Sequence, residues 1–313
     1  MKILSAKIHF IFFIAVLAIA PVYSQTESGE RMKIGFQFLQ SEDFQSASVA
    51  FYAVLRAEPS NDKARLGLAI ALIGLEKPAE ASREIAKLLS RSPKDPRLLE
   101  MAAQTFWQQN RYAETENVLK RRLDMGDATA EWQALYGDAL DAQKKTAEAV
   151  AAYEKAVKAK PDSINYRYAL GSLYWKQIRY EEATREFTEI LKRQPDEPRA
   201  SFNLGDIYLT NGNAAKAVPF LEIAVKNFPD EFDTRFALGR AYLLTNKYQT
   251  AIEQLQIAIK LRPEIAEGFY QLGLALQKSG RREEAKIPFK KAQELQKKQR
   301  DSEAPVMTPK SNQ

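Results

Sequence analysis

The sequence predicts an all-α protein built from eight consecutive pairs of helices stacked into a solenoid. Three features that recur every 34 residues carry this prediction. The first is a small residue, glycine in six repeats and alanine in two: Gly35, Ala69, Ala103, Gly137, Gly171, Gly205, Gly239 and Gly273. The second is another small residue twelve positions later: Ala47, Ala81, Thr115, Ala149, Ala183, Ala217, Ala251 and Ala285. The third is a proline near the end of most repeats: Pro59, Pro93, Pro161, Pro195, Pro229 and Pro263.

The spacing of apolar residues within one repeat indicates two helices. In the fifth repeat, Leu170, Gly171 and Tyr174 fall on one face of a first helix, and Ala183 and Phe187 fall on one face of a second. Small residues allow the two helices to approach closely, and the proline ends the second helix. Each pair leaves an apolar side that only the next pair covers, so the repeats are expected to stack.

This 34-residue pattern resembles the tetratricopeptide repeat (TPR) family. The resemblance implies an all-α, right-handed superhelical solenoid of about eight helix-turn-helix repeats over residues 25–299. The repeats are expected to start near residues 28, 62, 96, 130, 164, 198, 232 and 266.

The N-terminal segment, residues 1–24, is predicted to be a signal peptide. It carries Lys2 and Lys7, then an apolar run from Phe10 to Ala20, then Val22 and Ser24 at the positions that a signal peptidase reads. The alternative is an uncleaved membrane anchor, but the apolar run is shorter than the roughly 20 residues that a spanning helix needs. We therefore expect an exported protein, located in the bacterial periplasm or secreted.

Two regions depart from the repeat pattern. The third repeat has Thr115, Arg122 and Asp127 where alanine, a small or apolar residue and proline are expected, which predicts a weak joint to the fourth repeat. The polar residues 300–313 are predicted to form a disordered tail.

The composition excludes most catalytic chemistry. The sequence has no cysteine, and its one histidine, His9, lies in the predicted signal peptide. This removes thiol and histidine catalysis and the common zinc and haem ligands, so we expect no enzyme, no cofactor and no metal site. Without residues 1–24 the chain has 44 basic and 40 acidic residues, a balance too mild to indicate nucleic-acid binding.

The candidate binding residues are those that the resemblance places on the concave groove of the solenoid. In the family this groove is lined by first-helix positions three before, one after and four after the packing glycine. One set, called the apolar patch, lies in the first three repeats: Met32, Phe36, Leu39, Leu66, Ile70, Ile73 and Trp107. The second set contains the aromatic row, one residue from each of the last four repeats: Tyr168, Phe202, Phe236 and Tyr270. The residues predicted around the row are Trp175, Arg199, Asp206 and Arg240.

Each set also has a structural interpretation. Aromatic residues at the row positions often pack against the adjacent helix in TPR proteins, and the apolar patch is alternatively covered by residues 25–27 or by self-association. The basic residue that chaperone-binding TPR proteins carry three places before the glycine is absent, because those places hold Met32, Leu66, Glu100, Ala134, Tyr168, Phe202, Phe236 and Tyr270.

The function expected from these features is a non-catalytic, exported scaffold that binds a protein or peptide along its concave face. The alternative is a carbohydrate-binding or envelope-polysaccharide assembly module, since aromatic rows also stack on sugar rings. A further hypothesis concerns residues 278–300, which carry nine basic and three acidic residues. They allow a weak contact with an anionic membrane surface, although a charged capping helix is the simpler interpretation.

Overall fold

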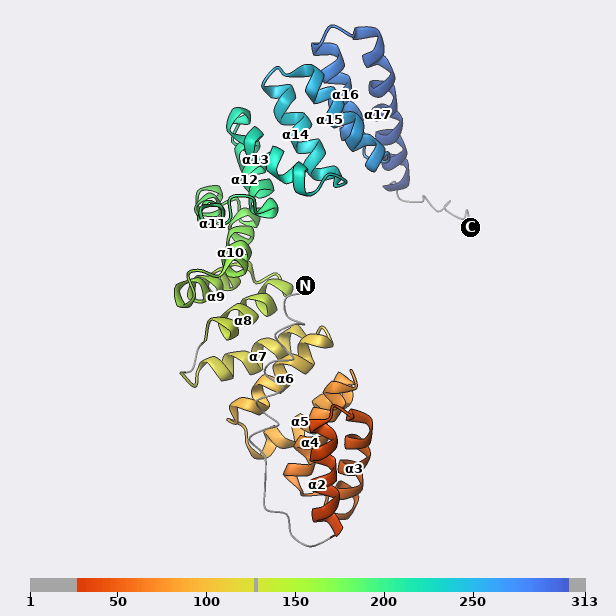
Figure 1. The fold of residues 1–313 in the computed structure, drawn as a ribbon. Helices are drawn as coiled ribbons and strands as arrows, with labels where there is room; N and C mark the ends of the chain where they lie inside the picture. The colour runs from red at the N-terminus through yellow and green to blue at the C-terminus, as the bar shows by residue number, and fades with distance from the viewer. Residues whose placement is uncertain (1–26, 127–128, 304–313) are drawn as a thin grey trace, which may run out of the picture. The chain divides into compact units, whose positions relative to one another are not determined.

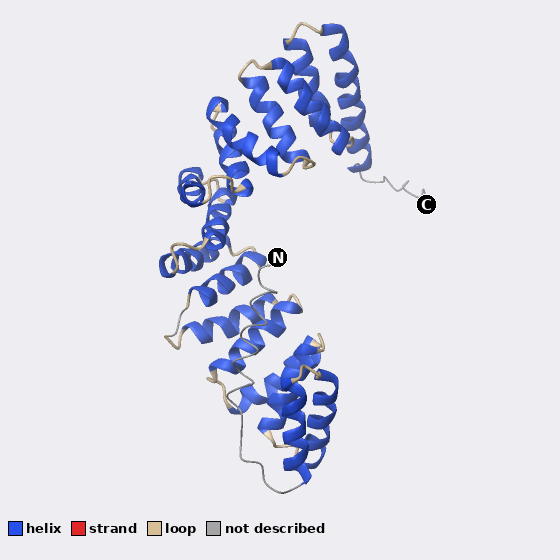
Figure 2. Cartoon of the chain, viewed as in Figure 1, coloured by secondary structure: helices blue, strands red, loops and turns tan. Residues whose placement is uncertain are grey.

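The computed structural model describes residues 27–126 and 129–303. These residues form sixteen α-helices and no strand (Figure 2). The predicted signal peptide therefore lies outside the described residues, as do Asp127 and residues 304–313. None of the described helices is long and apolar enough to cross a membrane.

The helices divide into two compact units, one ending at Pro161 and the other beginning at Asp162. Unit 1 contains α2 (Glu27–Gln40), α3 (Phe44–Ala57), α4 (Asp62–Gly74), α5 (Pro78–Arg91), α6 (Pro96–Gln108), α7 (Tyr112–Leu123), α8 (Ala130–Ala142) and α9 (Thr146–Ala159). Unit 2 contains α10 (Ile164–Lys176), α11 (Tyr180–Arg193), α12 (Pro198–Thr210), α13 (Ala214–Asn227), α14 (Phe232–Leu244), α15 (Tyr248–Leu261), α16 (Ala266–Lys278) and α17 (Arg282–Glu303). In each unit, consecutive helices pack against one another (Figure 1). The eight predicted repeats are thus confirmed as eight helical pairs.

The first helices of several repeats begin at a side-chain cap. Asn61, Asp95, Thr129, Ser163 and Glu197 stand 34 residues apart, each directly before a first helix. Each accepts a hydrogen bond from a backbone N–H in the first turn that has no partner within its helix. The caps fix where these helices start.

Two positions after the last residue of each first helix stands a residue in the left-handed backbone region, and these residues recur every 34 positions. These residues are Glu42, Glu76, Asn110, Lys144, Ile178, Gly212, Asn246 and Gly280, with φ between 56° and 89°. The residue after each one donates its N–H to a carbonyl five positions earlier, as Arg179 does to Tyr174 at 2.9 Å. This is the hydrogen bond that closes a helix end with a left-handed residue.

Ile178 is the least suitable residue at this position, since a β-branched side chain is strained at positive φ. Its side chain is 72% exposed, so it gains little from packing. We expect Ile178→Asn to raise the free energy of unfolding by about 1 kcal/mol, measured by chemical denaturation. Gly212→Ala, at the equivalent turn, should lower it by about 1 kcal/mol. Equal stability of both variants and the wild type would refute the strain argument.

The small residues of the repeat pattern set the distance between paired helices. A Cβ atom added at Gly171 would lie 2.9 Å from the ring of Phe187 on the second helix. The eight small residues that stand twelve positions after the packing glycine or alanine, from Ala47 to Ala285, are all buried. Each unit has one main apolar cluster, which joins its first and second helices.

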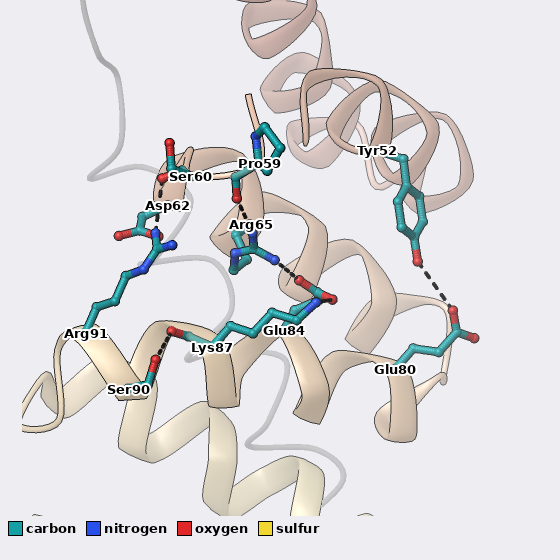
Figure 3. A network of polar contacts seen from close by, with 10 residues as sticks. All are labelled: Tyr52, Pro59, Ser60, Asp62, Arg65, Glu80, Glu84, Lys87, Ser90 and Arg91. Carbon is teal, nitrogen blue, oxygen red and sulfur yellow. Dashed lines mark hydrogen bonds and ion pairs between the residues drawn. The ribbon is translucent and has the colours of Figure 1, made fainter. Parts of the chain in front are cut away.

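A polar network ties the second repeat to the turn before it (Figure 3). The Arg65 guanidinium lies between the carbonyl oxygen of Pro59 and the Glu84 carboxylate on α5. Unit 2 repeats this arrangement in part, because Arg235 donates to Pro229 O at 2.8 Å and to Gln254 at 2.7 Å. This arginine position therefore links a turn to both helices of the following repeat.

Two residues of the third repeat that depart from the repeat pattern, Thr115 and Arg122, form hydrogen bonds within that repeat. Thr115 is buried and its hydroxyl donates to the Arg111 carbonyl at 2.9 Å, while the buried Arg122 bonds to Glu100 at 3.1 Å. A weak joint after this repeat stays a prediction. The tail prediction needs one correction, since α17 continues to Glu303 and residues 300–303 are helical.

Candidate functional site

The aromatic row lies on the first helices of unit 2, one ring each on α10, α12, α14 and α16. Tyr270 is 42% exposed and the other three rings are half-buried, whereas the leucine two residues after each ring is buried. The predicted contrast between these two stripes is confirmed. The row is therefore accessible on one side and anchored on the other.

Neighbouring aromatic residues hold three of the four rings. Tyr168 packs on Phe187 with ring centroids 5.8 Å apart, and Tyr270 packs on Phe289 at 5.7 Å. Phe236 stacks on Phe232 of its own helix at 5.3 Å. Because these contacts restrict the rings before any partner arrives, binding would cost little side-chain entropy.

Polar side chains surround the first ring of the row. The Arg199 guanidinium lies 4.6 Å from the centroid of the Tyr168 ring and bonds to Glu197 at 2.9 Å. The Asn203 side-chain amide donates to the Tyr168 hydroxyl at 3.2 Å. Arginine thus covers an aromatic face here, a geometry in which both groups are held in place.

A second polar group joins three consecutive repeats. The Trp175 side chain, 39% exposed, forms a hydrogen bond with Asp206. Burial raises the pKa of Asp206, while this hydrogen bond and the charge of Arg240 act in the opposite direction. Arg240 also lies 5.7 Å from the Phe236 ring centroid, so it connects this group to the row. All eight residues predicted in unit 2 therefore lie on or beside its first-helix face.

Comparison with protein-family models gives matches along much of the chain. Models described as tetratricopeptide repeat match residues 38–105, 168–232 and 266–299, and one described as TPR repeat matches residues 137–177 and 229–280. The chain belongs to the TPR family. No curated protein sequence matches it.

Solved TPR structures resemble about half of this TPR chain. A structure described as MamA MSR-1 C2 is 26% identical, covers 54% of this chain and 98% of its own, and superimposes with a TM-score of 0.50. MamA from Desulfovibrio magneticus RS-1 is 24% identical, with coverages of 56% and 98% and a TM-score of 0.52. YrrB, described as a TPR protein with an unusual peptide-binding site, is 21% identical, with coverages of 57% and 92% and a TM-score of 0.52. The chain thus shares the all-α repeat fold of these TPR structures.

The apolar patch predicted on the TPR repeats of unit 1 needs a correction. Met32, Phe36, Leu39, Ile70 and Ile73 are buried and belong to the core cluster of this unit. The physical reason is local packing, as in the edge-to-face contact of the Phe36 ring with the fully buried Phe51 ring at 5.1 Å. These five side chains are core residues in this structure rather than an exposed groove.

The other two members of the apolar patch are half-buried. Leu66 packs against the same core, and the Trp107 ring contacts the Tyr112 ring at 5.3 Å with an edge-to-face geometry. Their role as partner contacts stays a prediction, as does that of the aromatic row.

Sequence reasoning missed a pocket in unit 2. It has a volume of about 410 Å³ and lies between the first helices α14 and α16 and the start of α15. It is lined by Arg240, Leu243, Leu244, Asn246, Tyr248, Gln271, Leu274 and Lys278. Of these residues only Arg240 was predicted. Leu243 and Leu274 also occupy groove positions, four after Gly239 and one after Gly273, whereas the remaining five lie outside the three groove positions.

The basic segment at the C-terminus is only partly neutralised. Arg281 pairs with Glu284, Lys286 with Glu283 at 2.6 Å, and Lys291 with Glu294 at 3.8 Å. These pairs agree with a charged capping helix. A contact between this segment and an anionic membrane stays a prediction.

Proposed function

We propose that this TPR protein is a non-catalytic, exported scaffold that binds a protein or peptide partner along the first-helix face of unit 2. The observation that carries the proposal is the aromatic row, in which three of the four rings rest on a neighbouring aromatic ring and all four keep accessible surface. Aromatic residues and arginine dominate the energetics of protein interfaces, and both occur together on this face. The peptide-binding site in the description of YrrB is consistent with this use of the fold.

Export is the part of the proposal that rests on sequence alone. The charged, apolar and small-residue segments of residues 1–24 support cleavage after Ser24 and a location in the bacterial periplasm or outside the cell. Mass spectrometry of the protein from its native cells should find Gln25 at the N-terminus. An intact Met1 would contradict cleavage.

The binding face is tested with the two most exposed rings on it. Trp175→Ala combined with Tyr270→Ala should weaken binding by about 2 kcal/mol or more, as for interface anchors. The change in unfolding free energy should be small, because both side chains are about two-fifths exposed. The partner is captured by the wild-type protein from extracts of its native cells, then purified and titrated calorimetrically against each variant.

The matched control is Tyr52→Ala, which removes a ring of similar exposure, 44%, from a second helix in unit 1. It should leave the affinity unchanged. Equal affinity of the double variant and the wild type would disprove the proposed face. If the purified ligand is a glycan and the double variant loses it, the carbohydrate-binding alternative replaces the protein scaffold.

A further inference from the structure

The unit 2 pocket combines positive charge with exposed aliphatic surface. Arg240 and Leu244 stand four residues apart on α14, and Leu274 and Lys278 stand four residues apart on α16, so each pair shares a helix face. Leu244 is 58% exposed, which is unfavourable for a leucine in water. No acidic residue lines the pocket.

Among the described residues, the two cations of the pocket have no direct counter-ion, although Arg240 also lies 5.7 Å from the Phe236 ring centroid. Neither Arg240 nor Lys278 forms an ion pair with any acidic residue in the part of the chain that the structure describes. The attraction between Arg240 and Asp206 acts over a longer distance than a direct pair. A second acidic side chain adjoins the lining at Glu267, which accepts a hydrogen bond from the Gln271 amide at 2.6 Å. The lining itself therefore carries two positive charges and no negative charge.

This combination is specific to the last two repeats of unit 2. The positions of Arg240 and Leu244 in their repeat are held by Asp206 and Thr210 in the preceding repeat. That repeat offers one negative charge and a hydroxyl instead of a positive charge and an aliphatic side chain. A general property of repeat packing would not change in this way from one repeat to the next.

We infer that the pocket binds a segment of a partner protein that places an acidic side chain beside an aliphatic side chain. The carboxylate lies between Arg240 and Lys278, and the aliphatic group covers Leu244 and Leu274. The inference rests on the proposed function and adds the chemistry of the segment that is bound. A peptide fits better than a sugar, because a sugar ring stacks on flat aromatic surface and the lining offers three leucines, Leu243, Leu244 and Leu274, against one aromatic ring, Tyr248.

The probes are fluorescein-labelled twelve-residue peptides whose binding to the purified protein is measured by anisotropy. The first peptide alternates glutamate and leucine between Gly-Ser ends and has an amidated C-terminus. Two others replace glutamate by glutamine or by lysine. A fourth has glutamine in place of every glutamate and ends in a leucine with a free carboxylate. It tests whether the charge comes from the end of a chain or from an internal acidic side chain.

The glutamate peptide should bind at least about tenfold more tightly than the glutamine and lysine peptides, and more weakly as salt is raised. Arg240→Glu with Lys278→Glu should reverse this preference, so that the lysine peptide binds more tightly. Leu244→Ser should weaken the glutamate peptide while keeping its preference over lysine. Tighter binding of the free-carboxylate peptide than of the glutamate peptide would overturn the assignment to an internal acidic residue.

The control variant is Arg282→Glu with Lys298→Glu, which changes the net charge equally on α17, away from the lining residues. It should keep the original preference. If it also reverses the preference, or if the pocket variant does not, net charge rather than the pocket decides binding and the inference is wrong. A captured partner that loses affinity in the Trp175 and Tyr270 double variant but not in the pocket variant would refute the pocket alone. The opposite result would refute the proposed face alone.

Discussion

Phe187→Ala is expected to lower the free energy of unfolding by about 3–5 kcal/mol, the scale of a fully buried phenylalanine replaced by alanine. Phe187 on α11 has no exposed surface and fills the space next to Gly171 on α10. Because glycine provides no side chain on the opposite helix, nothing there can move in to fill the cavity. Chemical denaturation followed by circular dichroism measures the loss.

Phe187→Leu is the matched control, since it keeps most of the volume and should cost less than about 1.5 kcal/mol. The alanine variant should also affect binding, because Tyr168 of the aromatic row rests on the Phe187 ring. A loss below about 1 kcal/mol for Phe187→Ala would show that the paired helices close over the cavity. The ring would then not be the spacer that the 34-residue pattern implies.

The helical pairs could be predicted from the sequence because packing between paired helices depends on residue size. A small residue such as Gly171 can be recognised in the sequence by its type. Its recurrence every 34 residues indicates where each first helix lies. The left-handed helix ends were less visible. Gly212 and Gly280 suit positive φ, but Ile178 at the equivalent turn does not, so no single residue type marks the position.

The candidate site was only partly predictable, because exposure depends on neighbouring repeats. Positions three before and four after the packing residue hold Tyr168 and Trp175 in unit 2, and both rings keep accessible surface. The same positions hold Met32 and Leu39 in the first repeat, where both side chains are buried. Position in the repeat gives the face of a helix, but the burial of that face depends on which side chains of the same and the following repeats cover it.

The pocket illustrates the same limit. Its lining comes from two first helices and the start of a second helix, so no one repeat contains it. The sequence offers two signals: Leu243 and Leu274 occupy groove positions, and Leu244 stands at a position that is polar in the preceding repeat. The sequence does not show that Lys278 of α16 lines the same pocket as Leu244, which only the structure reveals.

Arg65→Met is expected to lower the free energy of unfolding by about 3 kcal/mol, at the lower end of the range for breaking a buried ion pair. The side chains of Arg65 and Glu84 are only 10% and 14% exposed, so removal of the arginine leaves a carboxylate and the Pro59 carbonyl with less compensation (Figure 3). Lys87 still bonds to Glu84 at 2.7 Å, which limits the loss.

The pH dependence and two controls distinguish this pair from an ordinary surface contact. Burial raises the pKa of Glu84, but hydrogen bonds from Lys87 and Arg65 outweigh it and hold the pKa below its usual value of 4.5. The stabilisation is therefore present above that value and is lost as the pH falls, so the difference between Arg65→Met and the wild type should shrink in acid. Arg91→Met, at the half-exposed pair with Asp62, should cost less than about 1 kcal/mol. Arg65→Met with Glu84→Met should recover part of the loss, because no buried charge is then left uncompensated. A double variant less stable than Arg65→Met would show that the carboxylate stabilises the second repeat without its arginine.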